Sequence, residues 1–168
     1  MSRPPIELTL ARRTDAKPIA LMSRDLVESG LPWAWTTTRV AEQIRSRESN
    51  VLAARADGQV VGFAIMQYFA EHAHLNLLAV ETAYRRLGIG QQLLVWLEET
   101  CRAGGIFSVR LEVRAGNSSA QTFYRRLGYH DDKILPGYYR GRESALRMIH
   151  DLREGAHLPR SHSLGGRE

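Results

Sequence analysis

The sequence predicts an α/β (α+β) fold, with a mixed β-sheet carrying helices on both of its faces. Short apolar, β-branched runs alternate with amphipathic helical segments along the chain. Turn signals rich in glycine, proline and aspartate separate these segments. The predicted order is a strand, two helices, three strands, a helix, a strand, a helix and two strands, which is typical of a layered domain. A length of 168 residues suits one such domain.

The first half of the chain predicts four strands and two helices. The helices are indicated by a capping residue followed by helical spacing of apolar side chains. Asp57 and Gly58 form a favoured two-residue turn, which predicts a hairpin between the second and third strands. In chain order the six elements are strand 6–10, helix 16–28, helix 37–45, and strands 51–56, 59–69 and 73–80.

The second half predicts two amphipathic helices and three strands. In the first helix, Leu93, Leu97 and Cys101 share one side. The elements are helix 91–102, strand 107–113, helix 120–127, and strands 129–133 and 144–151, with residues 136–139 expected between the last two strands. Glycine, serine, proline, arginine and histidine dominate after Glu154. We therefore expect a domain over residues 1–153 and a flexible C-terminal tail over residues 154–168.

Composition excludes several classes of protein. The apolar fraction of 43% and the charged fraction of 24% are ordinary for a globular protein. No apolar run approaches the ~20 residues that span a bilayer, and residues 1–5 lack the apolar stretch of a signal peptide. A lone cysteine, Cys101, rules out an internal disulfide and is interpreted as a buried structural thiol. We therefore expect a cytoplasmic protein without a membrane partner.

The net charge of +5 comes mainly from arginine, because only Lys17 and Lys133 are lysines. Arginine suits planar anions such as phosphates. The basic residues are spread along the chain and form no long block. This pattern favours a surface that attracts a polyanionic small molecule over one that binds nucleic acid.

Residues 85–90, Arg-Arg-Leu-Gly-Ile-Gly, stand between a predicted strand and a predicted helix. A helix start offers unpaired N–H groups and partial positive charge to a phosphate. Gly88 and Gly90 lack a Cβ, so the backbone can approach an anion or adopt a positive φ. A dinucleotide fingerprint would need glycine in place of Leu93, and the Gly-Lys-Ser/Thr of a P-loop is absent. The loop thus predicts another kind of phosphate site, or a glycine turn without a ligand.

Four sequence motifs follow one another along the second half of the chain. They are Leu-Leu-Ala-Val at 77–80, Tyr-Arg-Arg-Leu-Gly-Ile-Gly at 84–90, Leu-Glu-Val-Arg-Ala-Gly-Asn at 111–117 and Phe-Tyr-Arg-Arg-Leu-Gly-Tyr at 123–129. A tyrosine pair, Tyr138-Tyr139, comes after them. In this order and spacing the motifs resemble those of the GNAT acetyltransferases, and within them the RimI-type N-terminal acetyltransferases of ribosomal proteins. The resemblance is dense over residues 75–148.

The resemblance implies a mostly antiparallel mixed sheet whose fourth and fifth strands splay apart. The pantetheine arm of acetyl-CoA would enter that gap and pair with backbone groups, as an added strand would. The resemblance implies acetyl-CoA as co-substrate and no metal. The residues that it implies for acetyl-CoA are Leu78, Ala79, Val80, Arg85, Arg86, Leu87, Gly88, Ile89, Gly90, Gln91, Asn117, Ser119 and Tyr124.

Two side chains are candidates for the chemistry of acetyl transfer. Glu112 lies between Leu111 and Val113 on a predicted strand, so its carboxylate should point away from the core and into a cleft. The resemblance makes Glu112 the general base, through water, for direct attack by the amine, and Tyr124 the general acid toward the thiolate. Two other interpretations stay open: Glu112 could be held by an arginine such as Arg114, and Tyr124 could be a core aromatic.

The histidines His72 and His74 are the other titratable candidates. They share a face at i, i+2, but no third metal ligand is evident, so no metal site is expected. Either a solvent-facing role or a part in substrate contact or base catalysis fits them.

The acceptor is expected to be a primary amine, and the energetics favour a peptide or protein N-terminus. An α-amine with a pKa of about 7.8 loses its proton near pH 7 at a cost of about 1 kcal/mol, against about 5 kcal/mol for lysine. Residues 134–137 lack the basic residues usual in the RimI branch. A small-molecule amine acetyltransferase and a non-catalytic acetyl-CoA sensor therefore remain alternatives, as do monomer and homodimer. The expected acceptor-binding residues are Trp33, Trp35, His74, Tyr138 and Tyr139.

Overall fold

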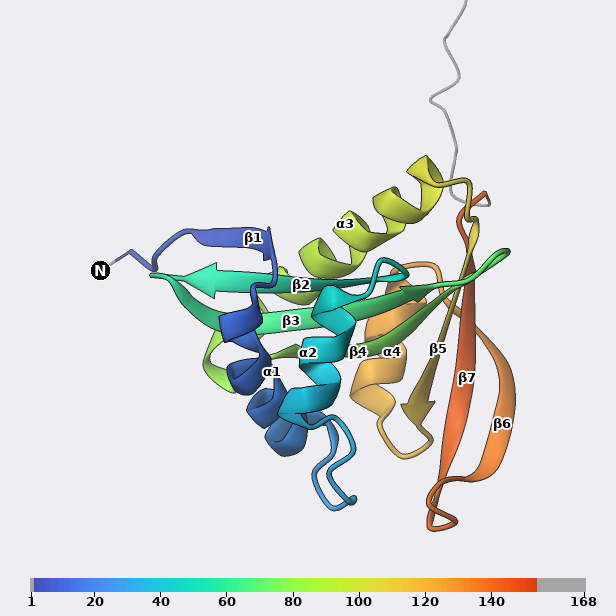
Figure 1. The fold of residues 1–168 in the computed structure, drawn as a ribbon. Coiled ribbons are helices and arrows are strands. Elements are labelled where there is room, and N and C mark those ends of the chain that lie inside the picture. Colours follow the sequence, from blue (N-terminus) through green and yellow to red (C-terminus); the bar gives the residue numbers. More distant parts are fainter. Residues whose placement is uncertain (1, 154–168) are drawn as a thin grey trace, which may run out of the picture.

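Seven strands form one mixed sheet in the computed structural model, which describes residues 2–153 (Figure 1). The predicted tail at 154–168 lies outside the described residues. The strand order is β1-β2-β3-β4-β5-β7-β6, and every neighbouring pair except β4–β5 is antiparallel. The strands are β1 (Ile6–Leu10), β2 (Ser49–Ala56), β3 (Gln59–Tyr68), β4 (Ala73–Val80), β5 (Ser108–Arg114), β6 (His130–Tyr139) and β7 (Glu143–Asp151).

Helices cover both faces of the sheet, as predicted (Figure 1). One apolar cluster contains Leu93 and Leu97 of α3 and Tyr124 of α4, packed on β2–β5. The other contains Ile19 of α1 and Val40 of α2, packed on the opposite face. In the described residues, no helix is long and apolar enough to cross a membrane. The helices are α1 (Ala16–Met22), α2 (Thr37–Arg45), α3 (Ile89–Ala103) and α4 (Ser118–Arg126).

Strands β4 and β5 separate soon after they start, which confirms the expected splay. Their parallel pairing comprises Ala73 opposite Val109 and His74 opposite Arg110. Beyond this point β4 still pairs with β3, and β5 still pairs with β7. Among the described residues, no strand pairs with the β5-facing side of β4 over residues 75–80, so a ligand could pair there as an added strand would.

A β-bulge at Asn76 changes which face the side chains of β4 point to. Met66 lies opposite Leu75, while the preceding residue, Ile65, lies opposite Leu77, so Asn76 is an extra residue in β4. Leu75 packs in the α3 cluster and Leu77 in the α1–α2 cluster, and Leu78 returns to the α3 side. Bulges often re-aim side chains next to active sites. The consecutive leucines 77 and 78 were the sequence signal for this break in alternation.

One predicted element has a wrong boundary, and the others lie within two residues of their expected bounds. The helix predicted over 16–28 forms as α1 continued by a π-helical turn, Ser23–Val27, with Glu28 as its C-cap. The strand predicted over 129–133 continues to Tyr139, so residues 136–139 lie inside β6 and not between the last two strands. This is possible because β6 is an edge strand where the missing N–H of proline is tolerated and the register with β7 shifts.

Candidate active site

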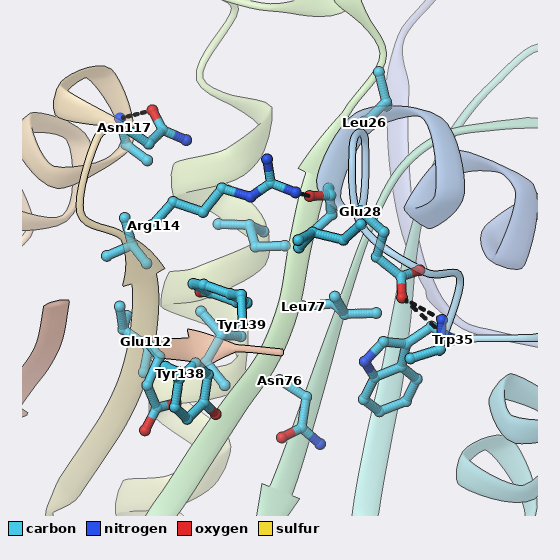
Figure 2. A pocket seen from close by; sticks show the side chains of 18 of the residues that line it. Leu26, Glu28, Trp35, Asn76, Leu77, Glu112, Arg114, Asn117, Tyr138 and Tyr139 are labelled. Atoms are coloured by element: carbon cyan, nitrogen blue, oxygen red, sulfur yellow. Dashed lines mark hydrogen bonds between the residues drawn. The ribbon is translucent and has the colours of Figure 1, made fainter. Parts of the chain in front are cut away.

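A pocket of about 470 Å³ opens at the point where β4 and β5 separate (Figure 2). Its walls come from β4, β5, the start of α4, the chain between α1 and α2, and the end of β6. Eight of the residues predicted from sequence line it. They are Trp35, His74, Leu78, Glu112, Asn117, Tyr124, Tyr138 and Tyr139.

Glu112 faces this pocket, as the alternation of β5 predicts, and two cationic partners hold its carboxylate. His74 Nε2 lies 2.5 Å from Glu112 Oε2, and Arg147 Nε donates to Oε1 at 3.1 Å. Burial raises the pKa of Glu112, but its hydrogen bonds with His74 and Arg147 outweigh burial and hold that pKa below its ordinary value. The carboxylate is therefore ionised at neutral pH. The arginine that holds it is Arg147, opposite Glu112 on β7, and not Arg114.

His74 contacts an acceptor oxygen with each ring nitrogen. Nδ1 lies 2.5 Å from Asn76 Oδ1, and the Asn76 amide nitrogen donates to Gln67 at 3.4 Å, which turns its carbonyl oxygen toward His74. Burial lowers the pKa of His74, but the hydrogen bonds with Glu112 and Asn76 outweigh burial and raise it. When His74 is protonated, both nitrogens donate to these oxygens, and the ring then has no lone pair for a substrate proton.

His72 lies apart from this network. It precedes β4 and stacks on Phe69, with ring centroids 4.8 Å apart, and it does not line the pocket. Among residues 2–153, no group of three or more metal-ligating side chains comes together.

Tyr124 projects from α4 into the pocket and is 9% exposed. Its ring packs edge-on against Tyr129, with centroids 5.6 Å apart. Burial raises the pKa of Tyr124 above its ordinary value, with a smaller contribution from Tyr139. The phenol therefore keeps its proton at neutral pH and can donate a hydrogen bond into the pocket.

The start of α3 presents free backbone donors. Gly88 is the N-cap at a φ of 78°, a left-handed conformation that favours glycine, and its carbonyl accepts from Gln92. Within the described part of the chain, the amides of Ile89, Gly90 and Gln91 have no hydrogen-bond partner and no side chain caps them. Such an end suits an anion.

The missing side chain of Gly90 also serves the packing of α3. A Cβ on Gly90 would lie 3.3 Å from the Phe123 ring, which is tighter than ordinary contact, and its φ is not positive. The absence of a side chain there lets α3 lie close to α4.

The other side chains predicted for acetyl-CoA and the acceptor lie outside the pocket lining. Arg85 donates to the Val80 carbonyl at 3.1 Å, and Arg85, Arg86 and Leu87 are exposed. Ile89 is buried, so only its backbone is available to a ligand. Ala79 packs in the α1–α2 cluster. Ser119 and Trp33 are exposed.

Glu28, which sequence reasoning missed, places Trp35 in the pocket wall. Its Oε1 accepts from the amides of Ala34 at 2.7 Å and Trp35 at 3.1 Å, and Oε2 accepts from the Ser23 hydroxyl at 2.9 Å (Figure 2). The Arg39 guanidinium covers the Trp35 ring at 3.8 Å. This buried carboxylate fixes the chain between α1 and α2 at the mouth of the pocket.

Comparison with known proteins identifies the family. The profile of the acetyltransferase (GNAT) family matches residues 21–129, more than half of the chain. The chain belongs to the GNAT family. The matched segment contains β4, β5 and the start of α3. It therefore includes the split in the sheet and the free amides described above.

Relatives of this GNAT chain include N-terminal acetyltransferases. An uncharacterized N-acetyltransferase of Methanocaldococcus jannaschii is 41% identical over 97 residues, covering 57% of this chain and 62% of its own length. The chain thus spans less than two thirds of that relative. An N-alpha-acetyltransferase of Sulfurisphaera tokodaii is 30% identical over 158 residues, covering 84% of this chain and 90% of that one. The crystal structure of the ribosomal-protein-S18-alanine N-acetyltransferase from Escherichia coli superposes with a TM-score of 0.77 and 26% identity, covering 88% of this chain and 94% of the other.

Two residues of this GNAT site were missed for different reasons. Arg147 reaches Glu112 across the β5–β7 register, which no local pattern encodes. Asn76 enters the pocket through the bulge in β4, for which the doubled leucine was the available signal.

Proposed function

We propose that the protein transfers the acetyl group of acetyl-CoA to a primary amine, and that the acceptor is the N-terminal α-amine of a peptide or protein. One observation carries the proposal. An ionised carboxylate, Glu112, and a protonated phenol, Tyr124, line one pocket at the split between β4 and β5.

The surroundings of the pocket fit acetyl-CoA as the co-substrate. The open side of β4 offers backbone groups to the pantetheine amides. The free amides at the start of α3 suit the pyrophosphate, with Arg85 and Arg86 adding positive charge nearby. Asn117 caps α4 by accepting from the Ala120 amide at 3.1 Å, which holds its amide group at the pocket wall.

The reaction needs a neutral amine, and the two hydrogen bonds of the His74 ring support Glu112 rather than His74 as the group that receives its proton. The amine nitrogen attacks the thioester carbonyl carbon, the C–S bond breaks, and the amine proton passes through water to Glu112. The low pKa of Glu112 makes it a weak base. This suffices for an α-amine, whose deprotonation at pH 7 costs about 1 kcal/mol, and falls short for lysine at about 5 kcal/mol.

Tyr124 stabilises the leaving thiolate. A thiol with a pKa of about 8.5 is a stronger acid than any phenol whose pKa stands above 10. Complete proton transfer from Tyr124 to sulfur is therefore uphill, so the phenol acts chiefly as a hydrogen-bond donor while the C–S bond breaks.

The names of the relatives support a protein N-terminus as acceptor. The relative from S. tokodaii is named for α-amino acetylation, and the structure from E. coli for the N-terminal alanine of a ribosomal protein. The pocket mouth is lined by the flat side chains of Trp35, Tyr138 and Tyr139, which suit an extended peptide.

An acceptor screen tests this function. Release of CoA thiol is measured with peptides that have free or blocked N-termini, with blocked peptides that contain lysine, and with polyamines and aminoglycosides. We expect turnover only with free N-termini. Turnover with small amines alone would show that the acceptor is a small molecule and not a peptide N-terminus. Acetyl-CoA binding without any turnover would identify a sensor.

Tyr124→Phe tests the role of the phenol. We expect kcat to fall about 10²-fold with unchanged acetyl-CoA affinity, because the ring packing remains and only the donor is lost. Tyr68→Phe is the matched control, since Tyr68 bonds Asn50 outside the pocket. Equal rates for wild type and Tyr124→Phe would remove Tyr124 from the mechanism.

A further inference from the structure

Two segments flank the mouth of the pocket, and one side chain contacts both of them. The first is the chain from Leu26 to Trp35, here called the entry loop, and the second is the β6–β7 turn with the residues beside it, 138–143. We propose that Arg114 is a positioning residue that holds these two segments at a fixed separation and thereby sets the affinity for the acceptor. The inference rests on the proposed function for its kinetic part.

Arg114 fastens the entry loop through backbone carbonyls. Its Nη2 donates to Val27 O at 3.1 Å and to Ser29 O at 2.8 Å, across more than 80 residues of sequence. Figure 2 shows the Arg114 side chain extending from β5 toward the segment that carries Glu28. The two carbonyls lie at the end of the π-helical turn Ser23–Val27 and just after it, where the last carbonyls of a helix lack intrahelical partners and carry partial negative charge. A guanidinium supplies both the donors and the compensating charge.

The same guanidinium holds the β6–β7 turn. Arg114 Nε lies 3.5 Å from Glu143 Oε2, and its central carbon lies 5.9 Å from the Tyr139 ring. Tyr139 and Glu143 are opposite each other at the base of the turn. The Arg114 side chain is 24% exposed and that of Glu143 is 39% exposed, so solvent screens this ion pair and the two carbonyl hydrogen bonds are the firmer contacts of Arg114.

Glu28 links the backbone that Arg114 binds to the pocket wall. It stands between the two carbonyls that Arg114 holds, and its own carboxylate holds the amides of Ala34 and Trp35. Movement of the Arg114 contacts would therefore shift Trp35 on one side and Tyr139 on the other. The Glu112 carboxylate has other partners, and the free amides of α3 lie on another element.

The Arg114 side chain contacts the segments beside the pocket mouth and not the catalytic groups, which predicts a change in the acceptor KM rather than in kcat. Loss of Arg114 should weaken acceptor binding because both flanking segments gain freedom and an acceptor must order them. The chemical step and acetyl-CoA binding use groups outside the described contacts of the Arg114 side chain, since its contact with Asn117 is made by the backbone carbonyl. Arginine is needed because its planar fork reaches two carbonyls and a carboxylate at once, whereas lysine presents a single ammonium.

The experiment compares Arg114→Gln and Arg114→Lys with wild type, using the best peptide from the acceptor screen. For Arg114→Gln we expect a rise of about 10-fold in acceptor KM, a change in kcat below about 3-fold, and an unchanged acetyl-CoA dissociation constant by calorimetry. Arg114→Lys should fall between wild type and Arg114→Gln. Arg125→Gln is the matched control, since Arg125 of α4 forms an exposed ion pair with Asp131 of β6, and it should leave all three constants unchanged.

Hydrogen exchange measures the structural part without any substrate. In Arg114→Gln, amides of both the entry loop and residues 138–143 should exchange faster, with β2, β3 and α3 unchanged. If Arg114→Gln does not fold, Glu143→Gln removes only the turn contact and should give a smaller rise in KM and faster exchange at 138–143 alone.

Two results would overturn the inference: an unchanged acceptor KM, or a parallel loss of kcat and acetyl-CoA affinity. Wild-type protein without turnover on any amine would instead contradict the proposed function. In that case exchange still decides the structural part, because unchanged exchange in both segments contradicts the role of Arg114.

Discussion

Two glutamate–histidine pairs lie on opposite faces of the same sheet. Glu98 of α3 accepts from His150 Nδ1 of β7 at 2.6 Å, and Glu112 of β5 pairs with His74 Nε2 of β4 at 2.5 Å. The bonds are alike in chemistry and length. Glu98 lies among the residues that pack α3 on the sheet, and Glu112 lines the pocket.

What differs is the third neighbour of each pair. Tyr129 donates to Glu98 at 3.2 Å and stacks near His150, and Gly128 leaves the space that the His150 ring fills, since a Cβ there would lie 2.6 Å from it. Glu112 has Arg147 as third partner and an open cavity beside it. A carboxylate–imidazole pair thus stabilises the core where packing encloses it. Where the pair borders a cavity, its carboxylate is a candidate catalytic group.

Glu112→Gln should have the largest effect on kcat and should distinguish the pocket pair from the core pair. We expect kcat to fall about 10²- to 10³-fold, because the amide cannot take the amine proton. Steady-state kinetics at saturating acetyl-CoA measures it. Glu98→Gln is the matched change on the other face and should leave kcat within about 2-fold. Equal rates for the two variants would mean that Glu112 is not the base.

Glu98→Ala should lower the stability of the protein, because Glu98 has a structural role in the core. Removing this buried acceptor leaves His150 and the Tyr129 hydroxyl unsatisfied, and we expect a loss of about 3 kcal/mol in the free energy of unfolding. Urea denaturation measures the loss. Glu99→Ala on the exposed side of α3 is the control and should stay within about 0.5 kcal/mol. A loss no larger than that of the control would show that the pair does not brace the core.

The pH dependence of the pocket pair gives a smaller but sharper test. The pKa of Glu112 is lowered, so its contribution to stability is present above about pH 4.3 and lost as pH falls through the folded value. The pKa of His74 is raised, so its contribution is complete below about pH 6.5 and lost as pH rises through the folded value.

The stability difference between wild type and His74→Asn should therefore be largest between about pH 4.3 and 6.5. Denaturant unfolding at several pH values measures this difference. A difference that is flat, or that grows above pH 6.5, would contradict the ionised pair.

Local sequence patterns predicted most of the fold. The Asp57-Gly58 hairpin forms, with positive φ at both residues, because these residue types tolerate the left-handed conformation. The alternation of residues 108–114 correctly aims Glu112 away from the core. The end of the strand predicted over 129–133 was wrong, since the irregularity of β6 depends on its register with the distant strand β7. The helix over 16–28 formed, but the π-helical form of Ser23–Val27 was not predicted.

The sequence by itself determined the order of elements, the family motifs and the facing of Glu112, because these follow from periodicity and spacing within short segments. Only the tertiary structure decided what surrounds Glu112 and Tyr124. Arg147 meets Glu112 through strand register, Arg114 of β5 meets Val27 of the distant π-helical turn, and His150 of β7 pairs with Glu98 of α3. Such partners are set by packing between distant segments, so residue type alone cannot separate a catalytic carboxylate from a structural one.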